Sequence, residues 1–159
     1  MDGCDGAPTA AAARAARGLV VVVLAGALTA GCANATDLDE RLAAAAGQAA
    51  SAAASSALGL ELYLDGSLTA TVADVTFIDM TREAGAAQEA VTAQVVATPA
   101  EAERRDRLRA DIADVTDAIL RARALVAGAV PATEGPAIGT ALQDGAGTLT
   151  AAEDRLGAG

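Results

Sequence analysis

The clearest helical pattern of this chain is in residues 98–128, TPAEAERRDRLRADIADVTDAILRARALVAG. Thr98 suits the position just before a helix, Pro99 suits the first helical position, and Glu101 completes a capping box. Apolar residues then recur at spacings of four and three, the heptad pattern of a helix that packs along one stripe: Leu108, Ile112, Val115, Ile119, Ala122 and Val126. Because Gly128 follows, we expect one long helix that ends there.

The same stretch carries acidic residues four positions before basic ones. Such pairs face each other on a helix and stabilise it by about 0.2–0.5 kcal/mol each. The expected pairs are Glu101 with Arg105, Glu103 with Arg107, and Asp117 with Arg121.

Two further segments have helical spacing. After Gly135 and Pro136, the heptad spacing returns at Ile138, Leu142, Gly145, Leu149, Ala152 and Leu156. Three glycines weaken this last helix by roughly 0.5–1 kcal/mol each relative to alanine: Gly139, Gly145 and Gly147. An N-terminal helix is expected to open at Thr36 and to present mostly small residues on one face: Leu38, Leu42, Ala45, Ala49, Ala52, Ser56 and Leu60. Small side chains allow a partner helix to approach closely.

The segment from Leu60 to Val72 allows two interpretations. Its alternating leucines around Asp65-Gly66 fit a β-hairpin, but an isolated hairpin is marginal in water and no other segment offers a strand. We favour two helices joined at residues 65–67, the second running to about Val96. Its expected inward stripe is Leu68, Val72, Val75 and Ile78, with Asp79 pointing partly inward and paired with Arg82. The predicted fold is all-α, a small antiparallel bundle of three to four helices over residues 37–157.

The composition excludes several kinds of chemistry. The chain of 159 residues contains 46 alanines, no His, no Lys and no Trp, and its net charge is −10. The usual general base and the phosphate-binding lysine are therefore missing. Nucleic acid is a polyanion and a poor partner for this surface. Carboxylates remain, and Asp111, Asp114 and Asp117 recur three apart, but we interpret them as a solvated helix face and predict no metal site and no cofactor.

The N-terminal segment has the features of an export signal. Arg14 and Arg17 precede the apolar run LVVVVLAGAL at residues 19–28, which is too short to span a bilayer, for which about 20 residues are needed. The residues Leu28-Thr29-Ala30-Gly31-Cys32 resemble the lipobox of bacterial lipoproteins. That resemblance implies cleavage between Gly31 and Cys32 and a diacylglycerol on the Cys32 sulfur. The alternative is an ordinary signal peptide followed by an incidental cysteine.

The lipobox reading divides the chain into a signal peptide (1–31), a lipidated Cys32 with a short tether (32–36), and the helical domain (37–157). Residues 56–127 also resemble small Ala-rich actinobacterial envelope lipoproteins of unknown role, which implies no activity. Lipidation would place the protein at the extracytoplasmic face of the cell membrane.

The leading functional hypothesis is a non-enzymatic lipoprotein, with no catalytic residues, that has a structural role or contacts another envelope protein. The alternative is a lipoprotein that binds a lipid or other small ligand in an apolar pocket lined by Leu60, Leu64, Phe77 and Ile78. A hydrolase that uses Asp79 with a second carboxylate is the third hypothesis, and the missing residue types disfavour it.

Overall fold

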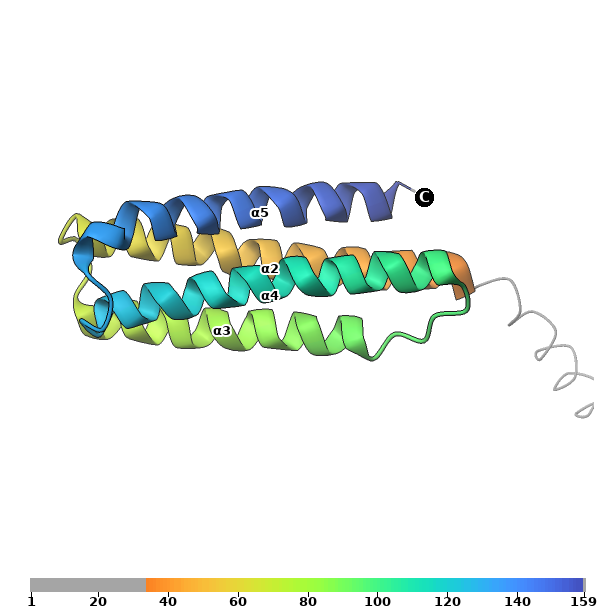
Figure 1. Cartoon of the computed structure of the whole chain (residues 1–159), viewed down its shortest axis with the longest axis horizontal. Coiled ribbons are helices and arrows are strands. Elements are labelled where there is room, and N and C mark those ends of the chain that lie inside the picture. The colour runs from red at the N-terminus through yellow and green to blue at the C-terminus, as the bar shows by residue number, and fades with distance from the viewer. Residues whose placement is uncertain (1–33, 159) are drawn as a thin grey trace, which may run out of the picture. The chain divides into compact units, whose positions relative to one another are not determined.

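The computed structural model describes residues 34–158, and the chain forms one compact unit from Leu38 onward. This described part contains four α-helices, one short 3₁₀-helix and no strand: α2 (Asn34–Leu64), α3 (Ala70–Thr92), α4 (Pro99–Val126), η1 (Ala132–Glu134) and α5 (Gly135–Gly157). The helices run alternately up and down (Figure 1). The predicted all-α antiparallel bundle is confirmed, with two helices rather than a hairpin across residues 60–72.

The turns follow from local chemistry. After α2, Gly66 adopts φ +74°, and the amides of Ser67 and Gly66 donate to the carbonyls of Leu62 and Tyr63 at 2.8 and 3.0 Å. This is a Schellman motif, in which glycine takes a left-handed conformation that other residues rarely adopt. Gly128 ends α4 in the same way, with φ +76°. The predicted turn at residues 65–67 and the predicted end at Gly128 are therefore confirmed.

The start of α4 has the predicted capping box. The Thr98 hydroxyl accepts from the Glu101 amide at 3.2 Å, while the Glu101 carboxylate accepts from the Thr98 and Ala97 amides. These hydrogen bonds lower the pKa of Glu101. The Glu101 carboxylate is used in this cap, and within residues 34–158 it does not form the expected ion pair with Arg105. Arg105 contacts Asp106 instead.

Of the other two expected ion pairs on α4, one is present and one is not. Arg107 contacts Glu103 at 2.6 Å, as predicted. Arg121 contacts Glu134 of η1 at 2.6 Å and not the expected Asp117. This ion pair links the α4–α5 connection to α4.

The core lies along the predicted stripes of α2, α4 and α5. All seven positions of the predicted α2 face are buried, and so are the α4 positions from Leu108 to Ala122. Near the end of α4, Leu125 takes the buried place and Val126 is only half-buried. The α2 helix begins at Asn34, two residues before the expected Thr36. Alanines fill much of the α2 interface, so neighbouring helices approach closely.

The predicted stripe of α3 is wrong. Val72 and Val75 are exposed, whereas the buried positions are Ala73, Phe77, Ala84, Ala87 and Val91. With the half-buried Met80, these positions have heptad spacing, and they lie one to two residues beyond the expected Val72, Val75 and Ile78. Three of the buried positions are alanines, whereas the two exposed valines, Val72 and Val75, lie off this stripe. The helix also ends at Thr92 and not near Val96.

Candidate functional site

The register of α3 leaves aliphatic side chains on the outside of the α2–α3 pair. Leu58, Val75 and Val72 are 56%, 52% and 49% exposed. Leu58 precedes Gly59, and Val75 precedes Thr76, whose methyl group lies 3.4 Å from where a Gly59 Cβ would be. Leu58 and Val75 are thus each one residue along the chain from a close contact between the two helices. We call Leu58, Val72 and Val75 the α2–α3 patch.

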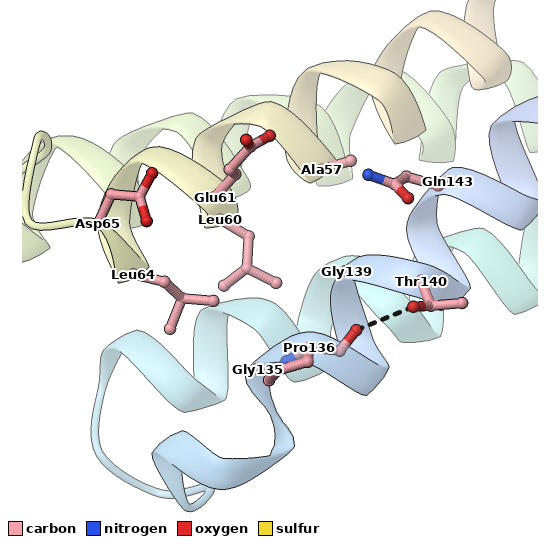
Figure 2. Close-up of a pocket in the computed structure, with 10 residues that line it drawn as sticks. All are labelled: Ala57, Leu60, Glu61, Leu64, Asp65, Gly135, Pro136, Gly139, Thr140 and Gln143. Carbon is pink, nitrogen blue, oxygen red and sulfur yellow. Dashed lines mark hydrogen bonds between the residues drawn. The ribbon is translucent and has the colours of Figure 1, made fainter.

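A cleft of about 210 Å³ lies between the last turns of α2 and the first turns of α5 (Figure 2). Leu60 and Leu64 point toward the start of α5 in this view, and Leu60 is buried while Leu64 is 42% exposed. The opposite wall has little side-chain bulk at Gly135 and Gly139. The Leu64 methyl groups lie 2.9–3.0 Å from where a Gly135 Cβ would be, so these helices meet closely there.

Gly139 keeps the cleft open one turn further along α5. A Cβ at this position would meet no described atom within 4 Å. The cleft is therefore apolar at Leu60 and Leu64 and open at Gly139.

The rim of the cleft is acidic. Glu61 and Asp65 are exposed, and they lie four residues apart at the end of α2. None of the ten lining residues is basic, and within residues 34–158 neither carboxylate forms an ion pair. Across from them, Thr140 donates to the Pro136 carbonyl at 3.1 Å, so its hydroxyl proton is used within α5. The cleft therefore has aliphatic side chains inside it and two carboxylates at its rim that no basic lining residue neutralises.

A second groove, of about 200 Å³ between α4 and α5, is lined by arginines at the other end of the bundle. Arg104 contacts Asp39 at 3.4 Å, Arg107 contacts Glu103, and the Arg155 Nε donates to a carbonyl of its own helix at 2.9 Å. Two of the three guanidinium groups therefore already have carboxylate partners.

Asp111, the first of the expected aspartates, also lines that groove. Asp111 and Asp114 line a third groove, of about 260 Å³, with Asp144, while Asp117 does not line it. Burial and the neighbouring Asp114 raise the pKa of Asp111. Within residues 34–158 no group of three or more His, Cys, Asp or Glu side chains has an arrangement that could hold a metal ion.

The remaining sequence predictions have mixed outcomes. Asp79 pairs with Arg82 at 3.0 Å as expected, but both side chains are more than half exposed, so the inward orientation is wrong. Of the pocket residues expected for a ligand, Leu60 and Leu64 line the end cleft, whereas Phe77 is buried in the core and Ile78 does not line it.

The anchoring prediction falls outside the described residues. Gly31 and Cys32 precede residue 34, so cleavage and lipidation stay predictions. Among the described helices, none combines the length and hydropathy that crossing a bilayer requires.

Sequence reasoning missed Glu61 and Asp65 as members of a site. The signal was present, because α2 has no basic residue in its last turn. Cations are favoured at helix C-termini and anions are not. Neither a family model, nor a curated protein, nor a solved structure gives a significant match to this chain.

Proposed function

We propose that this chain is a lipid-anchored, extracytoplasmic helical protein with a non-enzymatic structural or protein-interaction role in the bacterial cell envelope. The anchoring half is supported by the lipobox-like residues 28–32 and by the apolar run before them. The non-enzymatic half is supported by the absence of His and Lys from the sequence.

The α2–α3 patch is the observation that carries the interaction role. Scattered surface aliphatic residues are ordinary, whereas a contiguous apolar surface commonly marks a contact site. Leu58 lies 20 residues beyond Leu38 on α2, which is roughly 30 Å along the helix at ~1.5 Å per residue. A chain anchored at Cys32 would therefore hold this patch well away from the end of the bundle that follows the anchor.

Two measurements test the proposal. In native cells, the wild-type chain is expected to fractionate with the membrane, and Cys32→Ala is expected to move to the soluble fraction. A photo-crosslinking residue at Val75 is then expected to form an adduct with an envelope protein, while the same residue at the exposed Ala110 of α4 forms none. Membrane retention of Cys32→Ala would refute the anchor, and identical adducts at both positions would refute the patch.

Binding of a small ligand is the second candidate, and the end cleft favours it. Its volume of about 210 Å³ lies below the ~300–1,000 Å³ of typical ligand pockets. The cleft has room for a single side chain or a fragment, so protein contact remains the leading proposal.

A further inference from the structure

We propose that the end cleft between α2 and α5 receives one basic side chain, Lys or Arg, from the partner protein. Its aliphatic stem would lie on Leu60 and Leu64, and its cationic group would lie between Glu61 and Asp65. This inference rests on the proposed function and names the chemistry of the partner.

The charge at the end of α2 is the first argument. Residues four apart on a helix lie about 5–6 Å apart at their Cβ atoms, so Glu61 and Asp65 repel each other. Both also lie where the helix macrodipole is negative, next to carbonyls of the last turn. A cation placed between them relieves both effects at once. No basic side chain lines the cleft to do so from within the chain.

The shape of the cleft is the second argument. A fully enclosed cavity of about 150 Å³ accommodates a benzene molecule, so an open cleft of about 210 Å³ accommodates one long side chain. Lysine and arginine bury their methylene stems against apolar surface while the charged head stays near water. Leu60 and Leu64 provide the apolar surface, and the acidic rim is beside them.

The position of the cleft is the third argument. The α2–α3 patch and the cleft both include residues of the last two turns of α2, namely Leu58 in the patch and Leu60 and Leu64 in the cleft. Protein interfaces commonly combine a residue anchored in a pocket with surrounding apolar contacts that exclude water. A partner that contacts the patch is thus within reach of the cleft.

The test uses the full chain in a non-ionic detergent and a blocked peptide, Ala-Leu-Arg-Leu-Ala, as the probe. The matched control peptide carries citrulline, a neutral isostere of arginine. We expect saturable NMR shifts of the Gly135 and Gly139 amides with the arginine peptide and clearly weaker binding of the citrulline peptide. Equal binding of the two peptides, or no shift up to about 10 mM peptide, would overturn the inference.

Variants sharpen the test. The double variant Glu61→Gln, Asp65→Asn is expected to weaken arginine-peptide binding roughly 2- to 25-fold, which is the sum of two exposed ion pairs. Asp117→Asn removes an exposed acid of α4 outside the cleft and is expected to leave binding unchanged. The double variant should also melt at a higher temperature, since the repulsion at the end of α2 is gone, and this readout shows that it folds.

The inference and the proposed function fail in different ways. If Val75 cross-links to a partner and the double variant captures that partner equally well, the cleft inference is wrong and the interaction role stands. If the arginine peptide binds at the cleft but no adduct forms at Val75, the proposed interaction role is wrong and the cleft chemistry stands.

Discussion

Alanine substitutions at three glycines of α5 should have opposite effects on stability, although all three lie within one helix. At Gly139 and Gly147 a Cβ would meet no described atom within 4 Å. Replacing glycine by alanine in a helix interior gains about 0.5–1 kcal/mol, because alanine loses less conformational freedom on folding. We therefore expect Gly139→Ala and Gly147→Ala each to raise the free energy of unfolding by that amount.

Gly145 differs because α4 lies against it. A Cβ there would lie 2.6 Å from a Val115 methyl group, and Val115 is 1% exposed in the core. A β-branched side chain in a helix has one strongly preferred rotamer, so Val115 cannot turn away cheaply. Overpacking of a core costs about 1–3 kcal/mol, which exceeds the helix-propensity gain. Gly145→Ala should therefore lower the free energy of unfolding by up to about 2 kcal/mol.

Thermal unfolding followed by far-UV circular dichroism measures these differences. For a domain of this size, ~1 kcal/mol corresponds to a shift of about 4 °C in Tm. In a double-mutant cycle, Val115→Ala should remove the clash, so the pair should cost less than the sum of the single variants. If Gly145→Ala stabilised the protein as much as Gly147→Ala does, the close contact between α4 and α5 at this glycine would be refuted.

Two further predictions test the core and the raised pKa of Asp111. Phe77→Ala should lower the free energy of unfolding by about 3–5 kcal/mol because the ring is fully buried, whereas Leu58→Ala should change it by no more than about 0.5 kcal/mol; urea denaturation measures both. In the folded protein the pKa of Asp111 is raised above its ordinary value of 3.8. The charged form of Asp111 therefore lowers the free energy of unfolding at neutral pH, and this loss disappears once the pH falls below the pKa of Asp111 in the unfolded chain. Asp111→Asn should therefore raise Tm at pH 7 and converge with the wild type near pH 3; a constant difference across that range would contradict the assignment.

The sequence predicts most reliably the features that depend on neighbouring residues. The α4 capping box and the left-handed glycines at 66 and 128 form from side chains and amides within a few positions, and all of them are present. The α2 face was also predictable, because its leucines stand at regular spacing among small residues. These features need no knowledge of what the helix packs against.

The register of α3 could not be predicted in this way. Its buried face includes Ala73, Ala84 and Ala87, and alanine is as common on the exposed faces of this chain as on the buried ones. Tertiary packing determines which face of α3 is buried, because the Phe77 ring lies close to Gly59 of α2. A ring buries far more apolar area than a valine, so one correctly placed Phe77 outweighs two exposed valines. The cleft was missed for a related reason, since it forms between helix ends far apart in sequence.

The exposed valines of α3 and the acidic residues at the end of α2 both depart from local helix preferences, which supports the proposals. In a chain with 46 alanines, Val72 and Val75 occupy exposed helical positions where alanine has the higher helix propensity. Glu61 and Asp65 occupy a helix end where cations are favoured. Sequences that follow local rules elsewhere depart from them mainly at functional sites. Both departures flank the turn between α2 and α3, so that end of the bundle is where binding of a partner should be measured first.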